Sequence, residues 1–233
     1  MKLSVPIHRL KRQARLMSRK EGIPLHQALD RVAAREGFHQ WSLLSHRVAE
    51  PLPVADLLAQ FDSGDMVLIA ARPGHGKTRL CLQLVVAAAA AGRQAAFFSL
   101  EYTQTEVLAG LTQLGGDAAK FHVDCSDEIS ASTIEACFGT AQPGSLIVVD
   151  YLQLLDQDRR KPPLEQQVRA LRDLAKRQGI VIVCISQIDR RYDATTRPLP
   201  SLDDVRLPNP LELSLFDKAC FLQDSALQVL SVS

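Results

Sequence analysis

One short segment of this sequence, residues 72–79, combines residue types that bind phosphate groups. Gly74 and Gly76 allow the backbone to approach a phosphate without a clash from a Cβ atom. Lys77 can reach the β- and γ-phosphates of a nucleotide, and the Thr78 hydroxyl can ligate Mg²⁺. The segment therefore predicts an ATP and Mg²⁺ site formed by Arg72, Pro73, Gly74, His75, Gly76, Lys77, Thr78 and Arg79.

The flanking sequence supports this interpretation. The P-loop pattern has Gly, four residues, and then Gly-Lys-Thr or Gly-Lys-Ser, and only the first glycine is replaced here, by Ala71. An apolar run at 66–70 predicts a buried strand before the loop, and 77–91 predict an apolar helix that Gly92 ends. A glycine loop ahead of a core helix that binds nothing is disfavoured, because such a helix has no need of Lys77 in its first turn.

Three further polar residues each follow an apolar run: Asp150, Glu101 and Gln187. Asp150 ends a strand in the manner of a Walker B acid and could hold Mg²⁺. Glu101 could orient or deprotonate the attacking water, although an ordinary acid at a strand end stays open from chemistry alone. Gln187 could hydrogen-bond the γ-phosphate, or it is a loop amide without a role.

Strands and helices alternate after residue 54, which predicts an α/β fold with a doubly wound, mostly parallel sheet. Strands are expected at 66–70, 95–100, 121–124, 146–150, 180–185, 218–222 and 226–231. Helices are expected at 54–61, 77–91, 103–114, 130–141 and 164–178. Ligands of such sheets bind at the carboxyl ends of the strands, where the glycine loop lies.

Together, these motifs resemble the RecA-like ATPase domain of DnaB-type replicative helicases over roughly residues 54–230. The matching stretches are Ala70–Thr78, Phe98–Glu101, Val149–Leu154 and Ile185–Arg190. The resemblance implies a role in DNA replication, with Glu101 as the catalytic carboxylate acting with Lys77. It also implies that Asp150 serves Mg²⁺ and that Gln187 couples hydrolysis to a DNA-facing loop.

The sequence departs from that family in two respects. No Lys-x-Arg element that could serve as an arginine finger is found before Ser233, and a shorter basic module stands where the family has a primase-interacting helical domain. Five basic residues stay open as a substitute finger, as DNA contacts or as solvated side chains, the last being favoured for each alone: Arg159, Arg160, Lys161, Arg190 and Arg191.

Charge divides the chain into two expected domains, 1–50 and 51–233. The first holds ten Lys or Arg and four Asp or Glu, a net charge of +6, so the remainder of this +1 chain carries −5. Apolar spacing in the first domain predicts three short helices, the second opening near Pro24 with Leu25 on its apolar face and Gly37 at its end. Its basic face could contact nucleic acid, dock a protein or only be solvated.

The five cysteines contain no Cys-x-x-Cys pair, and Cys81, Cys137 and Cys184 fall within apolar elements, so core thiols in a reducing compartment are expected. There is no apolar signal segment and no stretch long enough to span a bilayer. We therefore expect a cytoplasmic protein without a membrane partner.

The leading hypothesis is a helicase-like ATPase that acts on DNA, either single-stranded DNA near residues 189–210 or DNA bound by residues 1–50. Residues 189–210 are polar and proline-rich and are expected to form a long, mobile loop. The alternative is a nucleotide-dependent switch or adaptor with little turnover that signals to a protein partner. A third hypothesis makes the basic module a sequence-reading DNA binder that the ATPase regulates, and homo-oligomer formation stays open.

Overall fold

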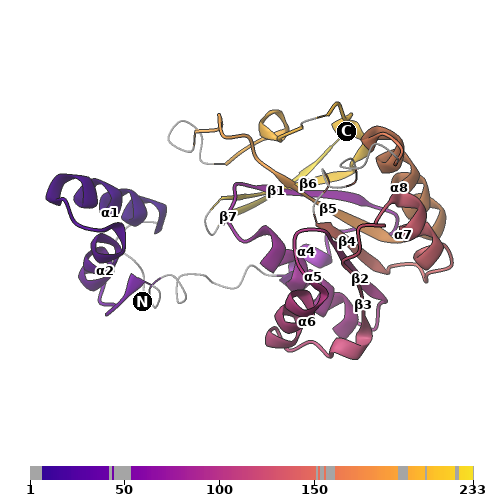
Figure 1. Cartoon of the computed structure of the whole chain (residues 1–233), viewed down its shortest axis with the longest axis horizontal. Coiled ribbons are helices and arrows are strands. Elements are labelled where there is room, and N and C mark those ends of the chain that lie inside the picture. The colour runs from indigo at the N-terminus through magenta and orange to yellow at the C-terminus, as the bar shows by residue number, and fades with distance from the viewer. Residues whose placement is uncertain are drawn as a thin grey trace. The chain divides into compact units, whose positions relative to one another are not determined.

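The structure, a computed structural model, describes residues 7–41, 44, 54–150, 152, 155, 161–193, 199–207, 209–223 and 226–232. It forms two compact units, Met1–Pro53 and Val54–Ser233. Each unit is described by itself (Figure 1). None of the described helices is both long and apolar enough to cross a bilayer.

The N-terminal unit is built on two helices, α1 (Ile7–Glu21) and α2 (Leu25–Arg35). Small side chains let them approach closely, and their buried contact is made by Leu10, Ala14, Ala28, Val32, Ala33 and Leu44. Gly37, at φ +85°, follows the end of α2 as predicted. The expectation for Leu25 is wrong, because this residue lies one turn before the first buried position of α2 and is 44% exposed. Most of the expected third helix lies outside the described residues.

The second unit contains a seven-stranded sheet in the order β3-β2-β4-β5-β1-β6-β7. All neighbouring strands run parallel except β7, which is antiparallel to β6. The strands are β1 (Met66–Ala71), β2 (Ala95–Ser99), β3 (Phe121–Asp124), β4 (Leu146–Asp150), β5 (Val181–Gln187), β6 (Lys218–Gln223) and β7 (Ala226–Ser231). The predicted α/β class with a mostly parallel sheet is confirmed.

Helices cover both faces of this sheet, as expected for parallel strands that are buried on both sides (Figure 1). They are α4 (Val54–Leu58), α5 (Lys77–Ala90), α6 (Gln104–Gln113), α7 (Ala131–Phe138) and α8 (Leu164–Gln178). α4, α5 and α6 lie on one face, and α7 and α8 lie on the other. α8 buries Val168 and Leu171 in the core and ends at Gly179, which adopts φ +65°. Three single-turn 3₁₀ helices complete the unit, Ala118–Lys120, Leu202–Asp204 and Leu213–Leu215.

Part of the segment after β5 folds back onto the sheet instead of projecting as a mobile loop. Ile188 and Val205 form an antiparallel bridge, and the Asp189 N–H donates to the Asp204 carbonyl at 2.7 Å. Tyr192 is 3% exposed and belongs to the core. The expectation of mobility is therefore wrong for these residues, because apolar side chains tie the segment down. Residues 194–198 and 208 lie outside the described residues.

The cysteine prediction is correct for three residues and wrong for one. Cys81, Cys184 and Cys220 are buried, Cys125 is partly buried, and all five thiols are free of disulfides. Burial raises the pKa of Cys184 to about 12, so this thiol stays protonated. Cys137 is exposed, because it lies on the outer side of α7 while Ile134 and Phe138 of the same helix are buried.

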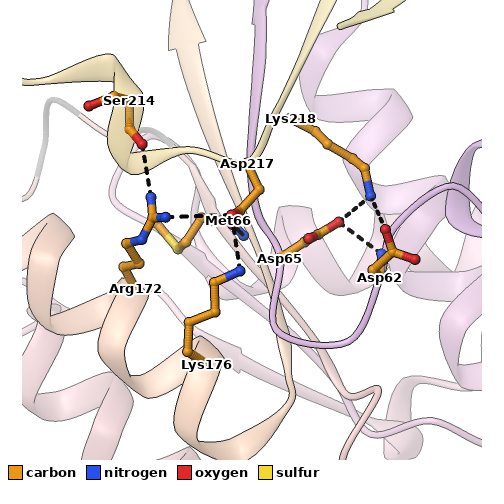
Figure 2. Close-up of polar contacts among 8 residues, drawn as sticks. All are labelled: Asp62, Asp65, Met66, Arg172, Lys176, Ser214, Asp217 and Lys218. Atoms are coloured by element: carbon orange, nitrogen blue, oxygen red, sulfur yellow. Dashed lines mark hydrogen bonds and ion pairs between the residues drawn. The ribbon is translucent and has the colours of Figure 1, made fainter. Parts of the chain in front are cut away.

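A network of charged side chains holds β1, β6 and α8 together where β1 and β6 begin (Figure 2). Its members are Asp62, Asp65, Arg172, Lys176, Asp217 and Lys218. Asp217 accepts the Met66 backbone N–H at 2.8 Å and pairs with Lys176 at 3.0 Å. Because it lies at the amino ends of the strands, this network supports the sheet from the edge opposite to the glycine loop.

Candidate nucleotide-binding site

The glycine loop connects β1 to α5. Ala71 is the last residue of β1, has no exposed surface and pairs with Gln187 of β5. The position that carries glycine in the general P-loop pattern is thus part of the strand here. A small Cβ fits this position, because the turn begins only at Arg72.

Two residues of the loop require glycine. Gly74 adopts φ +79° and Gly76 adopts φ +84°, a left-handed conformation that other residues rarely take. Gly76 is the N-cap of α5, so the unpaired N–H groups and the partial positive charge of the helix start lie at this loop. A Cβ atom at either glycine would meet no protein atom within 4 Å. The space beside the loop is therefore open to a ligand, and an anion is the ligand that a helix start favours.

Replacing Gly76 with alanine is expected to weaken ATP binding at least tenfold while costing only about 1 kcal/mol of stability, the strain of a positive φ. Gly92→Ala is the matched control, because Gly92 has φ +77° and equally open surroundings at the other end of α5. Titration with a fluorescent ATP analogue and thermal unfolding measure the two effects. Equal binding by both variants would show that the open space at Gly76 does not serve the nucleotide.

Lys77 and Thr78 occupy the first turn of α5. The Lys77 Nζ lies 3.5 Å from the Arg72 carbonyl oxygen, so the side chain lies along the loop. Burial lowers the pKa of Lys77, and the nearby charges of Asp150 and Glu101 partly oppose this shift. A bound phosphate would restore the preference for the charged amine.

Asp150 ends β4 directly opposite the start of α5. Its Oδ2 accepts a hydrogen bond from Thr78 Oγ1 at 3.1 Å, and the residue is 2% exposed. Burial, followed by the charge of Glu101, raises the pKa of Asp150 to about 7, although Thr78 and Lys77 favour the ionised form. Its Oδ1 is buried and finds no hydrogen-bond partner among the described residues. An unpaired buried carboxylate oxygen is costly, and a bound cation removes that cost.

The residues present fit Mg²⁺. Asp150 and Thr78 offer two oxygen ligands, and Mg²⁺ commonly takes one or two protein oxygens together with substrate phosphates and water. Within the described ranges, no three His, Cys, Asp or Glu residues gather as an all-protein metal site. The arrangement therefore suits a metal that arrives with a nucleotide.

Glu101 lies in the bend between β2 and α6 and is exposed. Its backbone N–H donates to the hydroxyl of Ser99 at 3.1 Å, which fixes the bend. Its carboxylate is close enough to Asp150 to raise the pKa of that residue. The structure thus brings Glu101 to the edge of the site without burying it, as suits a group that must meet water.

Gln187 ends β5, is partly buried and lies beside Ala71 in the register of the sheet. Its carbonyl oxygen accepts the Arg206 N–H at 2.7 Å, next to the bridge between Ile188 and Val205. The end of β5 is therefore connected both to the glycine loop and to the segment that follows it.

The other predicted residues have less defined roles. Arg72 and His75 are partly buried, whereas Pro73 and Arg79 are exposed. Sequence reasoning did not assign Ser99, whose buried hydroxyl holds the bend of Glu101; a serine just before a strand-end acid was its only signal.

The five open basic residues also differ. Lys161 donates to the Ile129 carbonyl at 2.9 Å and to that of Asp127, so the expectation of a solvated side chain is wrong for it. Arg190 and Arg191 are exposed, and Arg191 pairs with Asp189 at 3.2 Å. Arg159 and Arg160 lie outside the described residues.

The chain is similar in sequence to replicative helicases. A probable plasmid replicative DNA helicase of Chlamydia trachomatis is 28% identical, over 64% of this chain and 41% of the relative. The replicative DNA helicase DnaB of Nostoc is 29% identical, over 63% of this chain and 21% of the relative. The chain thus spans less than half the length of these two relatives.

Two solved structures share the fold. One, an isolated ATPase domain, superposes with a TM-score of 0.54 at 18% identity, over 77% of this chain and 80% of that chain. The other, a DnaB-like replicative helicase described with its interactions with primase, superposes with a TM-score of 0.59 at 17% identity, over 92% of this chain and 64% of that chain. The family model for the DnaB-like helicase C terminal domain matches residues 54–114 and 113–214. With most of its length matched by that model, and with the sheet order and glycine loop described above, this chain belongs to the DnaB-like helicase C-terminal domain family.

Proposed function

We propose that this protein binds ATP with Mg²⁺ at residues 72–79 and hydrolyses it in response to DNA. The observation that carries this proposal is the buried Asp150 Oδ1, which has no partner among the described residues, while Oδ2 of the same carboxylate accepts a hydrogen bond from Thr78 at the start of α5. A carboxylate buried in this way beside a helix start suits a nucleotide that brings its own cation.

Each predicted residue has a distinct task in this proposal. Lys77 and the N–H groups of the loop bind the β- and γ-phosphates, while Asp150 and Thr78 hold Mg²⁺. When bound, Mg²⁺ neutralises charge on the phosphate oxygens. Glu101, exposed at the edge of the site, orients or deprotonates the attacking water.

The DNA response rests on the end of β5. Gln187 lies beside the glycine loop in the sheet, and its carbonyl binds the backbone of Arg206 in the returning segment. A change at the γ-phosphate that moves Gln187 would therefore be felt by residues 188–206. Exposed Arg190 and Arg206 offer positive charge to a single-stranded DNA backbone there. The relatives are named replicative DNA helicases, which favours DNA as the partner.

The decisive experiment measures ATP hydrolysis with and without single-stranded DNA, on protein whose mass in solution is known. We expect Mg²⁺-dependent turnover that DNA stimulates, and the mass shows whether the active species is an oligomer. The same preparation carrying Lys77→Ala measures contaminating activity. Hydrolysis that is equal in both preparations would overturn the proposal.

The second candidate is a nucleotide-dependent switch with little turnover. The hydrogen bond between Gln187 and Arg206 favours it, because this contact would transmit nucleotide binding to the returning segment without hydrolysis. Hydrogen exchange in residues 188–206 would then slow when ATP binds, while turnover stays near the Lys77→Ala background. Turnover well above that background would exclude it.

A further inference from the structure

The outer face of α1 carries a row of cations that has no function in the nucleotide site. Arg12, Arg15 and Arg19 are exposed and follow one another at spacings of three and four residues, so they share one face of the helix. The opposite face, with Leu10 and Ala14, is buried against α2. The row extends over about 10 Å of helix.

These three guanidinium groups lack ion-pair partners among the described residues. The contrast within the same unit is Arg31, which pairs with Glu21 at 2.7 Å and so engages the one acid of α1. Like charges at helical spacings of three and four repel each other and cost stability. A row that is both unpaired and rigidly presented is therefore complementary to an extended polyanion.

We propose that this row, Arg12, Arg15 and Arg19, is a binding site for the phosphodiester backbone of DNA, separate from the ATP site. Guanidinium groups form bidentate hydrogen bonds with phosphates, and α1 presents three of them along one line. The proposed function supplies only the choice of DNA as the polyanion.

An anionic membrane surface fits this face less well. A helix that lies on a membrane inserts a broad apolar face beside its basic residues. The apolar face of α1 is already buried against α2, and Leu16, 57% exposed, is the large apolar side chain left outside among the described residues of the helix. The outer face thus offers charge with little area to insert.

The test compares the full-length chain with a triple variant, Arg12→Gln/Arg15→Gln/Arg19→Gln. Binding to a fluorescent oligo(dT) of about 30 nucleotides and to a duplex of about 30 base pairs is measured by anisotropy at several salt concentrations, without nucleotide. A control with the same change in net charge replaces exposed cations elsewhere with glutamine, namely Arg35, Lys120 and Arg177.

We expect the α1 variant to bind DNA at least tenfold more weakly at low salt, on one or both probes. Its slope of log K against log salt should shrink by about 2 to 3, because three phosphate contacts are lost. The control should retain wild-type affinity within about threefold. The two probes distinguish single-stranded from double-stranded DNA as the source of the phosphates.

The inference is overturned if the α1 variant and the control have the same affinity and salt slope. It is also overturned if wild-type protein binds vesicles rich in phosphatidylserine through this row but does not bind either DNA. Circular dichroism checks that the variant keeps its helices, which the substitutions do not threaten because all three side chains are exposed. ATP hydrolysis without DNA should be unchanged in the variant, so failure of this inference and failure of the proposed ATPase give different results.

Discussion

Asp150→Asn is expected to abolish ATP hydrolysis and, in the same protein, to raise the thermal stability of the nucleotide-free state above about pH 7. The loss of activity follows from the loss of the anionic Mg²⁺ ligand, and we expect a fall in turnover of about 1,000-fold or more. The gain in stability follows from burial, which raises the pKa of the carboxyl to about 7. Asparagine can still accept the Thr78 hydrogen bond without placing a charge in the core.

The sign of the pH effect follows from linkage. The pKa of the unfolded carboxyl lies near its ordinary value of 3.8 and that of the folded one near 7, so the folded state binds more protons between these values. The stability of the wild type therefore falls as pH rises from about 4 to 7, by at most about 4 kcal/mol, and that of Asp150→Asn does not share this fall.

Thermal unfolding in EDTA at about pH 5 and about pH 8 measures the effect. We expect Asp150→Asn to melt several degrees above wild type at the higher pH and much closer to it at the lower pH. Asp173→Asn, an exposed change on α8, is the control and should leave both activity and melting temperature unchanged. A variant that is inactive and also less stable at the higher pH would show that Asp150 serves the fold more than the cation.

Glu101→Gln is expected to lower turnover by about 100- to 10,000-fold while nucleotide affinity stays within a few fold of wild type, the signature of a group needed only for the chemical step. The substitution keeps the size of the side chain, and the backbone hydrogen bond to Ser99 does not depend on its charge. Single-turnover hydrolysis and titration with a fluorescent ATP analogue give the two quantities.

Glu106→Gln is the matched control for this variant. Glu106 lies in the first turn of α6, is exposed, and forms a capping box with Thr103 that glutamine can also form. We expect its turnover to equal that of wild type. If Glu101→Gln also retains turnover, the catalytic carboxylate lies elsewhere and the assignment taken from the resemblance fails.

The sequence was most informative where residue type and chain order coincide. The Lys77-Thr78 pair after two glycines and the apolar run that ends in Asp150 were readable because parallel strands bring such ends to one edge of a sheet. The strand boundaries also follow from short apolar runs, and all seven expected strands are present.

The sequence was less informative where the outcome depends on contacts between distant residues. Residues 189–207 are polar and proline-rich on average, yet Tyr192 and Val205 fix part of them against the core. Lys161 looked like a solvated charge, but carbonyl groups more than thirty residues away bind it. Average composition carries no information on such pairings.

The sequence by itself therefore determined the class of fold, the phosphate-binding loop and the acids that could serve it, because these depend on local pattern and on the order of strands. Only the tertiary structure decided how those groups act on one another. It buries Asp150 so that its pKa rises to about 7, joins one of its oxygens to Thr78 and leaves the other without a partner among the described residues. Burial and pairing depend on the packing of β4 against its neighbours, since the dielectric environment of a charge is set by every residue around it.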